Sequence, residues 1–324
     1  MTAAIAACGT DGHHFHLEGR FLKMNMAEFY VYSPDGLVNG IDTIHVKGGR
    51  FAYELPCERE GIIVVVLPNF SEIPVFVDPG ESVDMKADAS HIKDIEITGT
   101  KDNEMMTEWS KSIDGMSPPD QRTQAESFIR KNPKSIVSRW LLRKYFIQRP
   151  DADLRKAKQL TSVIDEVGVA DSHNGRFSED IQRVSQARVG DRLPLFAAKD
   201  IYGKNVYSRD LLKGKAVIIA WASWNYDGMN LHRTVRDFIK KAEDEGRSKP
   251  KVVSLSLDPS ATMTKDRLKN DSLPWPVVCD GKMWDSPLVS TLGIAFVPDN
   301  IVVSNGKIVG RHMKADEVIK ELEK

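Results

Sequence analysis

Hydrophobic and polar positions alternate through the first third of the chain, from residue 15 to about residue 100. Short runs rich in β-branched and aromatic residues recur at 29–32, 43–46, 51–55, 62–67 and 75–77. Turn residues separate these runs at intervals of about 8–14 residues, the spacing of strands in a small all-β domain. The pattern therefore predicts an all-β domain over residues 15–102, built as a small antiparallel sandwich.

The hydrophobic period becomes helical between residues 103 and 188. Leu154, Ala157, Leu160 and Ile164 recur at intervals of three and four residues, which is the spacing of one face of a helix. Tryptophan and methionine also lie on such stripes, where they usually fill the apolar face rather than hold a cofactor. We therefore expect residues 103–188 to form a helical connector.

Strand and helix patterns alternate from residue 189 to the end of the chain. Residues 216–221 form a continuous apolar run, as expected for a strand buried on both faces. A helix with Leu231, Val235 and Phe238 on its apolar face begins near Asn225, and further strands and helices follow. The order predicts an α/β sheet with helices on both faces over residues 189–324.

Charge and cysteine content exclude several classes of function. Lysine and arginine number 45 and aspartate and glutamate 46, a formal charge of −1, so no basic excess favours a nucleic-acid partner. No run approaches the ~20 apolar residues that span a bilayer. The three cysteines include no C-x-x-C pair, so we expect neither a disulfide framework nor a metal site. We expect no cofactor either.

The first residues resemble a bacterial lipobox, because the small apolar residues Ile5-Ala6-Ala7 precede Cys8 and Gly9. Such a signal implies acylation of Cys8 and a location on the periplasmic side of the cell envelope, with membrane contact only through the lipid. The segment before Cys8 is short and carries no positive charge, so an ordinary N-terminus is the alternative. We interpret residues 1–14 as a truncated signal and tether, and expect His13, His14 and His16 to belong to this flexible segment.

Three motifs near the start of the last domain, at residues 190–196, 210–215 and 221–224, resemble thioredoxin-like proteins of the TlpA/ResA type, which are related to the AhpC/TSA group. The resemblance implies a thioredoxin-like fold for residues 189–324 and a thiol-disulfide oxidoreductase family. It also implies that Pro298 is the family's cis-proline. The backbone of Val297 would then pair with a bound polypeptide by strand addition.

The family's catalytic motif is absent from this chain. Thioredoxin-like proteins of this type carry C-x-x-C after a tryptophan, but here Trp224 is followed by Asn225, Tyr226, Asp227 and Gly228. Disulfide exchange requires a thiolate that attacks sulfur, so no dithiol cycle can run at this site. Asparagine is instead a good helix N-cap, and Asp227 suits the positive end of the helix.

Residues 42–51 and 78–83 resemble a domain of unknown function that precedes thioredoxin-like domains in Bacteroidetes lipoproteins. We therefore expect a redox-inactive envelope protein without catalytic residues, which binds a polypeptide, an envelope protein or a second copy of itself. Trp224 and Tyr226 are expected to add exposed aromatic area. One alternative is a thiol-disulfide oxidoreductase whose sulfur comes from Cys279 or a partner, and another is a structural scaffold with a vestigial groove.

Overall fold

The computed structural model describes residues 12–69, 71–149, 151–167, 181–269, 271 and 273–324. The chain divides into two compact units, residues 1–141 and 142–324, and each is described by itself. Cys8 and most of the predicted tether lie outside the described residues. None of the described helices is both long enough and apolar enough to cross a membrane.

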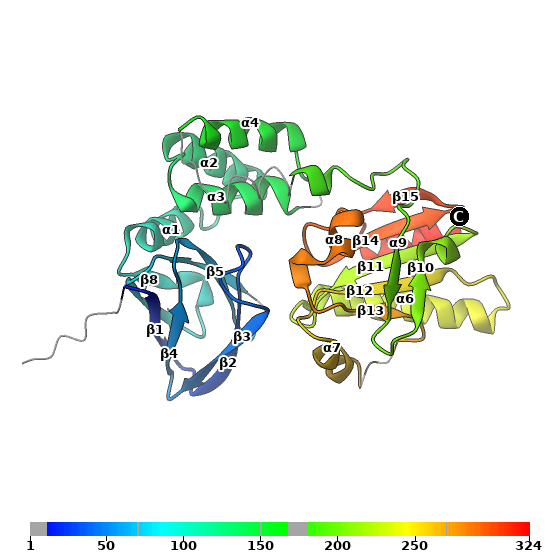
Figure 1. Ribbon diagram of the computed structural model, residues 1–324, viewed down its shortest axis with the longest axis horizontal. Coiled ribbons are helices and arrows are strands. Elements are labelled where there is room, and N and C mark those ends of the chain that lie inside the picture. Colours follow the sequence, from blue (N-terminus) through cyan, green and yellow to red (C-terminus); the bar gives the residue numbers. More distant parts are fainter. Residues whose placement is uncertain (1–11, 70, 150, 168–180, 270, 272) are drawn as a thin grey trace, which may run out of the picture. The chain divides into compact units, whose positions relative to one another are not determined.

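The first unit contains one sheet of eight strands, nearly barrel-shaped, in the order β6-β5-β2-β3-β4-β1-β7-β8 (Figure 1). The strands are β1 (His14–Leu22), β2 (Met26–Tyr32), β3 (Ile41–Lys47), β4 (Arg50–Pro56), β5 (Gly61–Val66), β6 (Glu72–Val77), β7 (Ser82–Asp88) and β8 (Glu96–Thr98). The buried rings of Phe21, Phe29 and Phe51 pack with centroids 5.1–6.1 Å apart. They form the centre of this unit's core.

The all-β prediction is confirmed, but the prediction of an antiparallel sandwich is wrong. The strands form one mixed sheet, because β1 pairs antiparallel with β4 on one side and parallel with β7 on the other. A parallel pair joins segments far apart in sequence, so alternation within a strand gives no signal for it. His14 and His16 lie in β1 rather than in a flexible tether.

Gly19 allows the tight packing at the centre of β1. A Cβ placed there would lie 2.3 Å from the Phe51 ring and 2.8 Å from the Met85 carbonyl oxygen. Both distances are shorter than any real contact, so only glycine lets Phe51 cross this strand.

Three helices follow in the first unit, namely α1 (Lys101–Ser112), α2 (Pro118–Lys131) and α3 (Ile136–Leu142). The buried Asn103 joins α1 to β6, since its amide donates to the Phe76 carbonyl at 2.7 Å and its oxygen accepts from the Phe76 N–H at 3.0 Å. The π-helix η2 (Arg143–Ile147) and α4 (Leu154–Asp165) belong to the second unit. The helices are present as expected; their role as a connector stays a prediction.

The second unit contains a five-stranded sheet in the order β13-β12-β11-β14-β15. The strands are β11 (Lys215–Trp221), β12 (Lys251–Ser256), β13 (Val277–Val278), β14 (Asp299–Ser304) and β15 (Lys307–Arg311). β11 pairs parallel with β12 and antiparallel with β14. This order, with a helix directly after the central strand, is a thioredoxin-like arrangement, as the resemblance implied.

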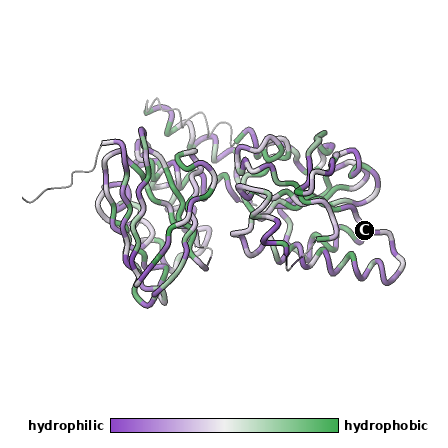
Figure 2. The backbone as a smooth tube through the Cα atoms, turned by 60° about the horizontal axis from the view of Figure 1, so that its bottom comes forward, coloured by the Kyte–Doolittle hydropathy of each residue, from purple (hydrophilic) through white to green (hydrophobic). Residues whose placement is uncertain are grey.

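Helices α6 (Tyr226–Asp244) and α9 (Ala315–Glu323) cover one face of this sheet. Leu231 and Val235 of α6 pack with Val318 of α9 against β11 and β14. Shorter elements complete the unit: the two-stranded sheet of β9 (Ala197–Lys199) and β10 (Asn205–Tyr207), and helices α7 (Ala261–Leu268) and α8 (Pro287–Thr291). Figure 2 shows hydrophobic stretches along the inner strands of each unit.

Candidate functional site at the start of α6

Asn225 caps α6 and also joins the helix to the loop before β14. Its side-chain oxygen accepts from the Gly228 N–H at 2.9 Å, as the motif predicts for an N-cap. Its amide nitrogen donates to the Val297 carbonyl at 3.2 Å, and the Val297–Pro298 peptide bond is cis. The Asn225 side chain therefore uses one of the two lone pairs of the backbone oxygen that strand addition at Val297 would also use.

Gly228 lies where α6 approaches the central strand. A Cβ at this position would lie 2.9 Å from the Trp221 Cβ and 3.7 Å from the Pro298 Cβ. The first distance requires the helix or the strand to move. The position is therefore packed for glycine and does not accept a second cysteine without adjustment.

The two aromatic residues of the motif differ in exposure. Trp224 is only 4% exposed, whereas Tyr226 is 52% exposed. The expectation that Trp224 adds surface area is wrong, because the turn from β11 into α6 places its large apolar ring inside, where burial is favourable. Of these two residues, only Tyr226 offers aromatic area to a ligand.

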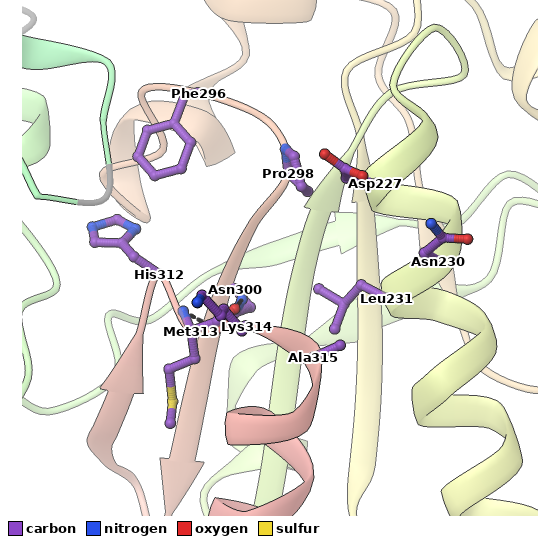
Figure 3. Close-up of a pocket in the computed structure, with 10 residues that line it drawn as sticks. All are labelled: Asp227, Asn230, Leu231, Phe296, Pro298, Asn300, His312, Met313, Lys314 and Ala315. Carbon is purple, nitrogen blue, oxygen red and sulfur yellow. Dashed lines mark hydrogen bonds between the residues drawn. The ribbon is translucent and has the colours of Figure 1, made fainter. Parts of the chain in front are cut away.

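A cavity of about 530 Å³ lies beside this helix start (Figure 3). One wall comes from α6, a second from the loop at Pro298, and a third from β14 and the turn between β15 and α9. Its lining residues are Asp227, Asn230, Leu231, Phe296, Pro298, Asn300, His312, Met313, Lys314 and Ala315. Of the predicted site residues, Asp227 and Pro298 line this cavity, while Asn225, Tyr226 and Gly228 do not.

A buried charge cluster holds the third wall in place. Asp299 is fully buried, and its carboxylate accepts from His312 Nδ1 at 2.6 Å and from Arg311 Nη2 at 3.3 Å. Arg311 also donates to four backbone carbonyls, those of Gln186, Ala187, Leu292 and Gly293. Arg311 and His312 thus compensate the negative charge of Asp299 inside the unit.

Two further contacts order the turn after β15. The Asn300 side chain accepts from the Met313 N–H at 3.2 Å and donates to the Met313 carbonyl at 2.7 Å. The Phe296 ring packs on the His312 ring with centroids 5.0 Å apart. The sequence predicts no site role for Asn300, His312 or Lys314; their one signal is that polar residues stand at both ends of the last strand pair.

The two cysteines that the structure describes are poorly suited to thiol chemistry. Burial raises the pKa of Cys57 and also that of Cys279, and the Cys279 thiol donates to the Asp258 carbonyl at 3.3 Å. Reactive cysteines instead have a lowered pKa. Within the described residues, no group of three or more histidine, cysteine, aspartate or glutamate side chains could hold a metal ion.

Comparison with protein families identifies the first domain. Residues 15–106 match the family described as "Domain of unknown function (DUF4369)". This confirms the expected domain of unknown function over the predicted β region. No curated protein matches the chain.

Solved structures titled as thiol-disulfide oxidoreductases or as thioredoxin-like proteins match part of the chain. A thiol-disulfide oxidoreductase from Bacteroides fragilis is 21% identical, with a TM-score of 0.37 over 41% of this chain and 98% of that chain. The thioredoxin domain of a thiol-disulfide oxidoreductase from Bacteroides vulgatus is 19% identical, with a TM-score of 0.37 over 42% and 96%. A thioredoxin-like protein from Bacteroides caccae is 12% identical, with a TM-score of 0.43 over 62% and 77%.

Proposed function

We propose that this protein is a binding protein whose thioredoxin-like unit does not exchange dithiols and holds a polypeptide partner beside α6. The observation that carries the proposal is a cavity of ligand size next to a helix start that bears Asn225 and Gly228 in place of two cysteines. Because residues 5–9 resemble a lipobox, we also propose that the protein lies on the periplasmic side of the envelope and is anchored through Cys8.

The absence of dithiol chemistry follows from the residues at the helix start. An amide and a glycine cannot form the mixed disulfide through which exchange proceeds. Cys279 is a poor source of the missing thiolate, because burial raises its pKa and its thiol donates to the Asp258 carbonyl. The alternative of a thiol-disulfide oxidoreductase therefore depends mainly on sulfur from a partner.

The binding role is supported by the size and lining of the cavity. Ligand sites typically enclose about 300–1,000 Å³ and are mostly apolar with a few polar groups. Leu231, Phe296 and Met313 supply the apolar surface here, and Asp227 and Lys314 supply charge. Tyr226 exposes an aromatic ring on the same first turn of α6 as Asp227, and such rings are common binding hot spots.

Two matched variants on α6 test this proposal. Asn230→Trp places a large side chain at the cavity wall, whereas Lys240→Trp places the same side chain on the exposed surface of the same helix. Crosslinking in envelope extract should capture a partner with the wild type and with Lys240→Trp, and lose it with Asn230→Trp. Equal capture by both variants would contradict a role for the cavity.

A structural scaffold is the second candidate, and the contact between Asn225 and Val297 favours it. This contact competes for the Val297 carbonyl oxygen, which strand addition would also use. A scaffold predicts that no partner is captured by the wild type or by either variant. The same crosslinking experiment therefore separates the two candidates.

A further inference from the structure

We propose that the cavity beside α6 recognises a terminal carboxylate with a neighbouring nitrogen donor, the chemistry of a polypeptide C-terminus or of a free amino acid. This inference rests on the proposed binding function and names the chemistry of its ligand. It follows from the way charged and apolar side chains are distributed over the walls of the cavity (Figure 3).

Positive charge is available at the turn between β15 and α9. Lys314 lines the cavity and forms no ion pair with any residue that the structure describes. His312 lines it as well, and its Nδ1 lies 2.6 Å from the buried Asp299 carboxylate. This leaves Nε2 as the ring nitrogen open to a ligand, and in the cationic ring Nε2–H donates a charge-assisted hydrogen bond to a carboxylate.

Hydrogen-bond acceptors lie on the α6 wall. Asp227 and Asn230 are three residues apart, so both side chains project from the same face of the helix. Within the described part of the chain, neither side chain has a hydrogen-bond partner. An amide N–H or an ammonium group of the ligand could be bound by the Asp227 carboxylate and by the Asn230 side-chain oxygen.

Apolar residues line the space between these two sets of polar groups. Leu231 and Ala315 come from the two helices, Met313 from the turn and Pro298 from the loop (Figure 3). The cavity of about 530 Å³ accommodates one or two residues with an apolar side chain. Carboxylate, nitrogen donor and apolar side chain together describe the last residue of a polypeptide, or a free amino acid.

Calorimetric titration of the full chain tests this assignment with three probes. These are a hexapeptide of alanines ending in leucine with a free carboxylate, the same peptide with a C-terminal amide, and free leucine. The free-acid peptide should bind about five-fold more tightly than the amide, the factor expected for roughly 1 kcal/mol of charge interaction.

Three variants assign the effect to residues. Lys314→Gln and His312→Gln should each reduce the preference for the free acid to about two-fold. Lys320→Gln is the matched control, because Lys320 is an exposed lysine of α9 that does not line the cavity. This control should keep the preference of the wild type for the free acid.

Some outcomes identify the source of the ligand, and others overturn the inference. Tight binding of the peptide but not of leucine supports a polypeptide C-terminus, and comparable binding of both supports a free amino acid. Equal affinity for acid and amide, or no binding of any probe at millimolar concentration, overturns the inference. In that case the crosslinking experiment decides on the proposed function. If Asn230→Trp loses the partner, the proposed function stands without the inference; if Asn230→Trp keeps the partner, both fail.

Discussion

Replacement of His232 by glutamine tests how a buried histidine makes the stability of the second unit depend on pH. His232 lies on α6, fully buried, with its ring 4.8 Å from that of Trp221. Its Nε2 lies 2.9 Å from the Ser254 hydroxyl, which accepts from the Trp275 indole N–H at 2.8 Å. Because the indole can only donate, the hydroxyl proton of Ser254 is free to point at Nε2, and the ring is held neutral.

The magnitude follows from the difference in pKa between the folded and unfolded states. Burial lowers the pKa of His232 to about 3, whereas an unfolded histidine titrates near ~6.5. Below pH ~6.5 the unfolded state binds a proton at His232 that the folded state does not bind. The contribution of the neutral His232 to stability is therefore complete above pH ~6.5 and is lost as the pH falls towards about 3. Between pH 7 and pH 5 the free energy of unfolding should fall by about 2 kcal/mol through this residue.

Hydrogen exchange of the β11 and β12 amides, corrected for intrinsic exchange rates, measures this loss in the full chain. The opening free energy of the wild type should fall by about 2 kcal/mol more than that of His232→Gln between pH 7 and pH 5. His45→Gln is the matched control, because His45 is exposed on β3 in the other unit. The same pH dependence in the wild type and in His232→Gln would refute the reasoning.

Three further outcomes are expected. The purified protein should not reduce insulin, and Asn225→Cys with Gly228→Cys should restore little activity, because the new Cβ at position 228 meets Trp221 at 2.9 Å; a rate close to that of an intact C-x-x-C protein would contradict this. Arg311→Met should lower the free energy of unfolding by roughly 3–5 kcal/mol in urea denaturation, since it leaves the buried Asp299 carboxylate without its cation; a loss below about 1 kcal/mol would argue against this pairing. Cys8→Ser, expressed in the native host from an upstream start, should move the protein from the membrane to the aqueous fraction, and unchanged fractionation would exclude acylation.

The local elements of the second unit could be predicted from sequence. The apolar run at residues 216–221 corresponds to β11, and the helix expected near Asn225 begins at Tyr226 with Asn225 as its cap. Both signals come from residues close together in the chain. The strand is indicated by its hydrophobic pattern, and the helix start by a side chain that can accept from the first free N–H groups of the helix. Long-range pairing has no such signal, and so the parallel alignment of β1 with β7 was not predicted.

The site shows the same division between local and distant features. The loss of both cysteines can be read directly from residues 224–228. The contact of Asn225 with Val297 joins residues 72 positions apart, and the burial of Trp224 depends on the complete packing around the turn. His312 and Lys314 become part of the site only because α9 starts beside α6, a juxtaposition that appears once the helices pack on the sheet.

The hydrogen bonds of Arg311 also determine where the chain can be cut without destabilising the second unit. Two of its four carbonyl acceptors belong to Gln186 and Ala187, upstream of residue 189, where the sequence pattern places the start of the thioredoxin-like domain. A fragment that begins at 189 lacks both acceptors, so that Arg311 Nη1 pairs with water instead, at a cost of about 0.5–1.5 kcal/mol for each hydrogen bond lost. Limited proteolysis should therefore yield a durable C-terminal fragment only when cleavage falls before Gln186, which makes this short segment an integral part of the unit that it precedes.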